Sequence, residues 1–153
     1  MRSSLASLLG LLLVSLTACG GGESPTGPGA SADSRLLLIS FLLQNADGES
    51  TLQEARLLLD SRLVGTYRGE AASAVDLGGV ALAVRTGNHT LTVVIDRQTR
   101  SPSRYSTGKL ESGSLANMIF VEGEQGPVAF LSLPREIVSL RTGDVHRITV
   151  NIP

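Results

Sequence analysis

The chain has 153 residues with 13 basic and 14 acidic side chains, so its formal net charge is −1. This balance excludes the strong positive field that non-specific nucleic-acid binding relies on, and no nucleic-acid partner is expected. A single cysteine excludes an intramolecular disulfide. With no tryptophan, two tyrosines and three phenylalanines, the chain must build its core mainly from leucine, valine and isoleucine.

The N-terminal segment has the three parts of an export signal. Arg2 gives a positive start, residues 5–16 are almost wholly apolar, and two small residues follow. At about 1.5 Å per residue, this apolar run falls well short of the roughly 20 residues that a transmembrane helix needs. We therefore expect residues 1–18 to be removed as a signal peptide.

The four residues Leu16-Thr17-Ala18-Cys19 resemble the lipobox of bacterial lipoproteins. The resemblance implies cleavage before Cys19, a diacylglyceryl group on its sulfur and an acyl chain on the new amino terminus. Two or more acyl chains hold a protein stably at a membrane. Because Gly20 replaces the aspartate that marks inner-membrane retention in that family, the resemblance implies an outer-membrane lipoprotein facing the periplasm. The alternative is an ordinary secretory signal in which Cys19 is incidental.

A linker and one folded domain are expected to follow. Residues 19–33 are rich in glycine, proline and serine, which is typical of a flexible tether. Residues 34–153 have the length of a single domain. Its first strand is predicted over residues 35–43, where apolar side chains on both faces indicate burial of both faces for part of the length. Residues 54–60 fit either a strand or a short helix.

Short strands separated by turn residues are predicted through the rest of the domain. A tight turn at residues 60–62 leads into one of them, and Gly78-Gly79 breaks another. Because glycine and asparagine tolerate positive φ, residues 86–88 predict a hairpin. Pro127 and Pro134 restrict the strand between them to a sheet edge or a strand end. The strands are expected over residues 63–67, 80–84, 89–96, 105–111, 118–121, 128–133 and 146–152. Within residues 89–96, Leu91, Val93 and Ile95 are expected on one face and Thr90, Thr92 and Asp96 on the other, and the even-numbered residues of 146–152 form an apolar face.

About seven to nine short strands at regular spacing, without a helical period, predict an all-β domain, an antiparallel β-sandwich. Residues 57–65 and 84–93 resemble small PEGA-like or immunoglobulin-like β-sandwich domains, which pair an apolar strand and an Asp-Gly turn with a later Gly-x-His-x-Leu-x-Val strand. Ser61 stands where those families have the turn glycine. Residues 85–93 also resemble residues 141–150, by duplication or by convergence on the same turn chemistry.

Three arginines are the candidate ligand-binding residues. Arg97, Arg100 and Arg104 line a predicted polar loop over residues 98–104, and guanidinium groups bind phosphate and carboxylate groups, such as those of lipopolysaccharide or of a partner protein. A solvated hairpin tip accounts for the same residues without a ligand.

Two other groups resemble metal-ligand sets without completing one. His89 and His146 with Asp144 would make a metal site only if the fold brought them together, and histidines at strand starts more often bond to backbone. Oxygen ligands for calcium alternate around Gly48, but too few carboxylates follow, and a plain turn is favoured; these residues are Asn45, Asp47 and Glu49. No metal or other cofactor is expected.

The sequence contains no Gly-x-Ser-x-Gly elbow and no phosphate-cradling Gly-x-x-x-x-Gly-Lys segment. We expect a non-enzymatic lipoprotein whose β-sandwich is an interaction or structural module of the cell envelope, contacting the membrane through Cys19 and possible envelope partners through a strand edge or the arginines. One alternative is a small-ligand or polysaccharide-binding module, although aromatic platforms for sugars are few. Another is a hydrolase whose serine triad assembles only in space.

Overall fold

A computed structural model describes residues 34–108, 117–123 and 126–153 of the chain. The predicted signal peptide, Cys19 and the predicted linker lie outside the described residues, and so does the end of the strand predicted over residues 105–111. In the part of the chain that is described, no helix is long and apolar enough to cross a membrane.

The described residues form twelve strands, which confirms the all-β prediction and corrects the expected count of about seven to nine. The strands are β1 (Ser34–Ser40), β2 (Leu42–Asn45), β3 (Leu52–Leu59), β4 (Arg62–Ala72), β5 (Ala74–Asp76), β6 (Ala81–Arg85), β7 (Gly87–Gln98), β8 (Ser103–Ser106), β9 (Met118–Gly123), β10 (Gly126–Ser132), β11 (Ile137–Leu140) and β12 (Val145–Ile152).

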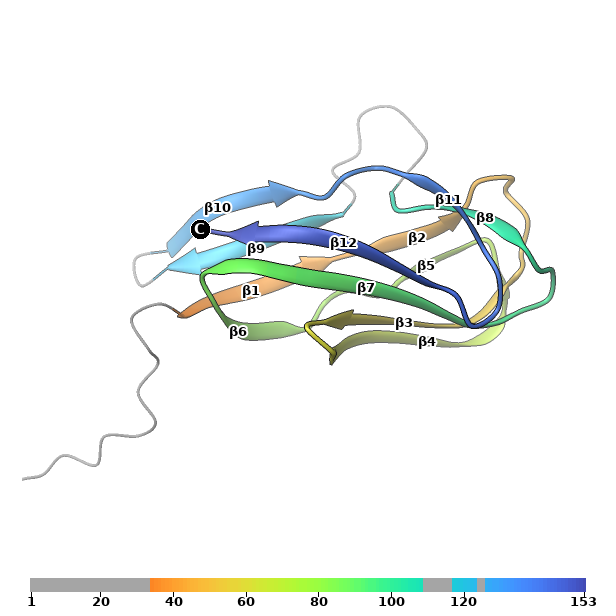
Figure 1. Cartoon of the computed structure of the whole chain (residues 1–153), viewed down its shortest axis with the longest axis horizontal. Helices are drawn as coiled ribbons and strands as arrows, with labels where there is room; N and C mark the ends of the chain where they lie inside the picture. Colours follow the sequence, from red (N-terminus) through yellow and green to blue (C-terminus); the bar gives the residue numbers. More distant parts are fainter. Residues whose placement is uncertain (1–33, 109–116, 124–125) are drawn as a thin grey trace, which may run out of the picture.

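These strands pair into three antiparallel four-stranded sheets (Figure 1). The β1 sheet has the strand order β10-β9-β1-β6, the β2 sheet has the order β11-β8-β2-β5, and the β3 sheet has the order β12-β7-β3-β4. As Figure 1 is drawn, β7 and β12 of the β3 sheet run in front of β1, β2 and β9. β10 contains Pro127 and is an edge strand as predicted, because proline has no N–H to donate to a neighbouring strand.

The first predicted strand is divided at Phe41, and the Gly78-Gly79 segment bridges the division. The amide of Leu77 donates to the Phe41 carbonyl at 2.7 Å, and the amide of Gly79 donates to the Ile39 carbonyl at 2.7 Å. A Cβ added at Gly78 would lie 2.2 Å from the Ile39 carbonyl oxygen, so only glycine permits this approach. The chain therefore passes here from β5 of the β2 sheet to β6 of the β1 sheet.

The prediction that both faces of the first strand are buried for part of its length is wrong for β1, where the face that carries Leu36 and Leu38 is exposed. Leu37 and Ile39 in β1 and Leu43 in β2 are fully buried. Leu36 and Leu38, which alternate with them, keep 42% and 43% of their surface exposed. The described residues thus leave the outer face of β1 open, although its sequence is as apolar as that of the inner face.

The hairpin predicted at residues 86–88 is also wrong. β6 pairs with β1, whereas β7 pairs with β3 and β12, so the two strands that flank the bend belong to different sheets. Gly87 does adopt a positive φ of 120°. Local turn chemistry predicted the bend correctly, but it does not determine which strands pair across it.

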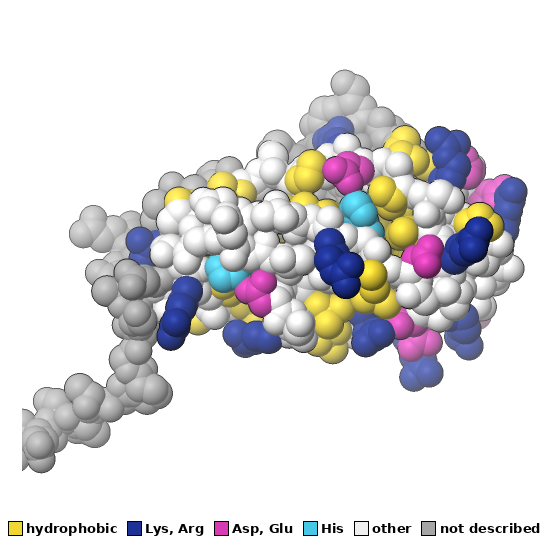
Figure 2. Space-filling model, viewed as in Figure 1, with side chains coloured by type: hydrophobic (Ala, Val, Ile, Leu, Met, Phe, Trp, Pro, Cys, Tyr) yellow, Lys and Arg dark blue, Asp and Glu magenta, His cyan; other side chains and the backbone are white. Residues whose placement is uncertain are grey.

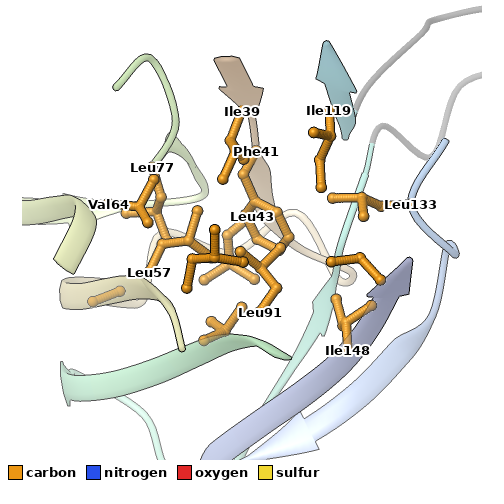
Figure 3. Close-up of a cluster of buried hydrophobic side chains, with 14 of the residues drawn as sticks. Ile39, Phe41, Leu43, Leu57, Val64, Leu77, Leu91, Ile119, Leu133 and Ile148 are labelled. Atoms are coloured by element: carbon orange, nitrogen blue, oxygen red, sulfur yellow. The ribbon is translucent and has the colours of Figure 1, made fainter. Parts of the chain in front are cut away.

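One hydrophobic cluster joins the three sheets (Figure 3). The period-two prediction holds in both long strands of the β3 sheet, where every second residue is buried: Leu91, Val93 and Ile95 in β7, and Ile148, Val150 and Ile152 in β12. Figure 3 shows residues of β1, β2, β3 and β9 meeting them in the interior. Residues 54–60, which fitted strand or helix, belong to β3 up to Leu59.

Candidate functional site

Two of the three predicted ligand-binding arginines share a cavity. Arg100 lies between β7 and β8, Arg104 lies in β8, and both line a cavity of about 230 Å³. Arg97 is exposed near the end of β7, with its Cα paired in register with Glu54 of β3, and it does not line this cavity. The predicted polar loop is therefore shorter than expected, since both of its ends belong to strands.

The two arginines of this cavity are paired with carboxylates. Arg100 Nη1 donates to Glu49 Oε1 at 2.6 Å, and Arg104 Nη1 donates to Asp47 Oδ1 at 3.3 Å. The carboxylates belong to the connection between β2 and β3, so the ion pairs join this connection to the β7–β8 loop and to β8. A phosphate or carboxylate ligand would have to compete with both acidic residues for these guanidinium groups.

The segment with calcium-like spacing is a plain turn. Asn45 is buried, and its Oδ1 accepts hydrogen bonds from the amide of Asp47 at 2.8 Å and from the amide of Glu49 at 3.4 Å. This is the way in which asparagine side chains stabilise turns. The Asn45 side-chain oxygen that would bind a cation thus accepts hydrogen bonds from two backbone amides instead.

The same asparagine begins a buried chain of hydrogen bonds. Asn45 Nδ2 donates to Thr51 Oγ1 at 3.1 Å, and Tyr105 Oη donates to Gln98 Oε1 at 2.6 Å. Thr51 and Tyr105 hydroxyls lie 3.1 Å apart, so the threonine must donate to the tyrosine. Gln98 Nε2 donates onward to the Leu140 carbonyl at 3.1 Å. The chain connects β2, β7, β8 and β11, and its role is structural.

The two histidines are not neighbours. The register of β7 and β12 places His89 opposite Val150, four residues from His146 along β12, which corresponds to roughly 14 Å at about 3.4 Å per residue. Asp144 accepts a hydrogen bond from the Arg141 amide at 2.8 Å and closes the turn before β12. Within the described ranges, no three histidine, cysteine or acidic side chains gather as a metal site would require.

His89 contacts an acceptor with each ring nitrogen. Nδ1 pairs with Asp60 Oδ2, and Nε2 lies 2.7 Å from the Arg85 carbonyl oxygen. A neutral imidazole has one N–H, so donation to both acceptors needs the charged imidazolium. Burial opposes this charge, but the hydrogen bonds to Asp60 and Arg85 outweigh it and raise the pKa of His89 above 6.5.

Asp60 holds the turn between β3 and β4 against β7. Its Oδ1 accepts the amide of Thr90 at 2.9 Å, and its own amide donates to the Thr90 carbonyl at 2.9 Å. Burial would raise the pKa of Asp60, but the hydrogen bonds from His89 and Thr90 prevail and lower it below 3.8. These contacts stabilise a two-residue turn with positive φ at Asp60 and Ser61, 47° and 71°, without glycine.

The His89–Asp60 pair resembles the histidine and the acid of a serine triad, but its geometry does not suit catalysis. In a triad, the second ring nitrogen faces the nucleophilic hydroxyl. Here that nitrogen faces the Arg85 carbonyl. His89 is therefore not placed as a base for a serine. The other histidine, His146, has Nε2 at 3.1 Å from Glu136 Oε2 but outside hydrogen-bonding geometry.

The His89–Asp60 pair predicts a pH dependence of stability. Because the pKa of His89 is raised in the folded state, its stabilisation is fully present below about pH 6.5 and is lost as the pH rises through the folded pKa. Because the pKa of Asp60 is lowered, its stabilisation is present above about pH 3.8 and is lost on acidification through the folded pKa. The pair therefore stabilises the fold most between these limits.

We expect His89→Gln to lower the free energy of unfolding at about pH 6 and to differ less from the parent protein at about pH 9. Urea unfolding at several pH values measures the difference, and an NMR titration should give His89 a pKa above 6.5. A constant difference between parent and variant across this range would show that His89 is not charged in the folded protein.

A shallow groove lies on the outer face of the β3 sheet. Figure 2 shows this side of the domain, on which basic and acidic side chains lie scattered and both histidines are visible. The groove has a volume of about 510 Å³ and is lined by Arg56, Leu58, Asp60, Ser61, Thr90, Thr92, Val94 and Arg147. Arg56 is held by Asp96 in a two-pronged pair at 2.6 and 2.7 Å. Arg147 is exposed and has no ion pair among the described residues.

The sequence did not indicate this groove, because its members come from β3, β7, β12 and a turn, and none is unusual alone. The signal that was present is the row of outward threonines in β7, which the predicted alternation already placed on one face. The groove offers one uncompensated guanidinium beside hydroxyl groups, which suits an anionic, hydroxyl-rich ligand. In comparisons with protein families, curated proteins and solved structures, the chain matches none.

Proposed function

We propose that this protein is a lipid-anchored module of a bacterial cell envelope. Cys19 carries the acyl chains, residues 19–33 are the tether, and residues 34–153 form a β-sandwich of the PEGA-like or immunoglobulin-like kind. The domain faces the periplasm from the outer membrane and acts without catalysis, as a binding or structural unit for an envelope partner.

The observation that carries this proposal is the separation of core and tether along the chain. The residues of the hydrophobic cluster extend from Leu37 to Ile152, and the lipobox-like segment precedes all of them. A domain that folds without its N-terminal segment can be held at a membrane by that segment alone. The two occupied ring nitrogens of His89 support a binding or structural role over catalysis.

The substitution Cys19→Ser tests the anchor. We expect the parent protein in the membrane fraction with incorporated radiolabelled palmitate, whereas the variant loses both the label and the stable membrane association while its domain stays folded. Ser15→Ala, four residues earlier in the apolar run, is the matched control and should behave like the parent. A Cys19→Ser protein that still carries palmitate, or a mature-length variant that stays in the membrane, would refute the proposal.

A second candidate function, polysaccharide or small-ligand binding, is favoured by the groove on the β3 sheet. Arg147 and the hydroxyls of Ser61, Thr90 and Thr92 suit a carboxylated sugar. For oligogalacturonate as the probe, this candidate predicts that Arg147→Ala weakens binding about tenfold or more, while Arg141→Ala in the turn before β12 has little effect. Equal affinity of the parent protein and both variants would count against it.

A further inference from the structure

The outer face of the β1 sheet carries an exposed apolar patch centred on β1. Leu36 and Leu38 are 42% and 43% exposed, and residues directly opposite each other on neighbouring strands share a face. The register places Ala83 and Ala81 of β6 opposite them on one side, and Phe120 of β9 opposite Leu38 on the other. Both alanines are exposed and Phe120 is partly so. This set of five residues is the β1 face.

The opposite outer surface of the domain is polar. The groove side of the β3 sheet carries threonines in β7 and Arg147 in β12. A sheet with one solvated face normally places polar residues outward, as the β3 sheet does. The β1 sheet departs from this rule along most of β1, and contiguous exposed apolar residues mark an interaction surface. This difference between the two outer surfaces indicates that the β1 face contacts an apolar partner.

The position of the proposed tether favours the lipid bilayer as the apolar partner of the β1 face. The tether ends where β1 begins, and Leu36 is two residues beyond Ser34. A flexible linker of about 15 residues has a root-mean-square span of about 21 Å. If Cys19 is lipidated, the start of β1 thus lies on average about 20 Å from its anchor, at an effective concentration near the millimolar range. Weak apolar contacts are then sufficient for docking.

The charges near the β1 face fit a lipid surface. Arg85 pairs in register with Ser34 and is exposed on the same face, where its guanidinium can meet a lipid phosphate. Glu122, opposite Leu36 in register, is an exposed acidic residue at the border of the β1 face. The face is therefore nearly neutral in charge, and its apolar side chains must supply most of the attraction.

We propose that the β1 face lies on the lipid bilayer to which Cys19 is anchored, leaving the groove of the β3 sheet turned toward the aqueous side. This inference rests on the proposed lipid anchor and adds an orientation to it. Apolar groups of an interfacial protein enter about 5–10 Å into the headgroup and acyl boundary. Leu36 and Leu38 would occupy this depth.

The sequence contains no tryptophan, so the fluorescence of one introduced tryptophan reports on a single position and can test the docking. Leu38→Trp places it on the β1 face, and Thr92→Trp places the matched control in the groove of the β3 sheet. The full lipidated proteins are inserted into phosphatidylethanolamine and phosphatidylglycerol vesicles with brominated acyl chains. We expect roughly twofold or stronger quenching of the tryptophan at position 38 and little at position 92.

Equal quenching at the two positions, or none at position 38 in protein that floats with the vesicles, would overturn the docking while leaving the anchor intact. Protein that fails to float would overturn the anchor, and the docking with it. A concentration-dependent blue shift at position 38 without lipid would assign the face to a second copy of this chain instead. Carbene footprinting of the unsubstituted protein gives an independent measurement, in which vesicles should protect residues 36–38 but not residues 90–92.

Discussion

Gly65→Ala is expected to lower the free energy of unfolding by about 3 kcal/mol or more. A Cβ at Gly65 of β4 would lie 1.4 Å from the carbonyl oxygen of Leu77 and 2.4 Å from its carbonyl carbon. Both atoms belong to the backbone, so no side-chain rotation removes the collision. Leu77 is buried and donates its amide to Phe41, and moving it would disturb the segment that bridges the two parts of the first strand.

Gly69→Ala on the same strand is the matched control. There the added Cβ would lie 3.0 Å from the hydroxyl of Tyr67, a side-chain end that can shift. Alanine in a strand interior otherwise restricts the unfolded chain more than glycine does, so this change should be neutral within about 0.5 kcal/mol or slightly stabilising. Urea unfolding of both variants measures the difference. Similar midpoints for the two would show that Leu77 does not pack on β4 as described.

Asn117→Ala is expected to cost about 2–4 kcal/mol. Asn117 is fully buried, and its Oδ1 accepts the amide of Leu42 at 2.5 Å while its Nδ2 donates to the Leu42 carbonyl at 3.2 Å. Leu42 lies between the β1–β9 ladder and the β2–β8 ladder. The side-chain amide of Asn117 forms the two hydrogen bonds that a paired strand residue would otherwise form with it. Alanine would leave two backbone groups of Leu42 without these partners, and unpaired buried groups are costly.

The backbone of Asn117 also favours asparagine at this position, because its φ is 67°, which asparagine tolerates better than alanine. Asn117→Gly separates the two effects, since it relieves the φ restriction but still removes the side-chain hydrogen bonds. It should therefore remain destabilised by more than about 1 kcal/mol. Asn151→Ala, which removes an exposed hydrogen bond to Asn88, should stay within about 0.5 kcal/mol. If Asn117→Ala resembles Asn151→Ala, the bridging role is wrong.

The inward faces of the strands were predictable because alternation is a local property. Leu91, Val93 and Ile95 needed only their own spacing to be assigned to the core, and they are buried. The turn at Asp60 and Ser61 and the edge position of β10 followed from local chemistry in the same way. The strand Ile137–Leu140 was missed because four residues are too few to establish a period.

The features that depend on pairing were not predictable. Residues 86–88 have turn chemistry that suits a hairpin, but the partners of β6 and β7 lie far away in the sequence. The pairing of Arg100 with Glu49 joins residues 51 positions apart, so composition showed a basic loop where the structure has balanced charge. Asn117 gave no signal of its role, because the Leu42 groups that it satisfies are 75 residues away.

The proposed anchor is tested most directly by mass spectrometry of the mature protein purified from its own cells. The account predicts an N-terminal peptide that begins at Cys19, with a diacylglyceryl thioether on the sulfur and an acyl chain on the amino group. A mature chain that begins at another residue, or that carries a free thiol at Cys19, would contradict it.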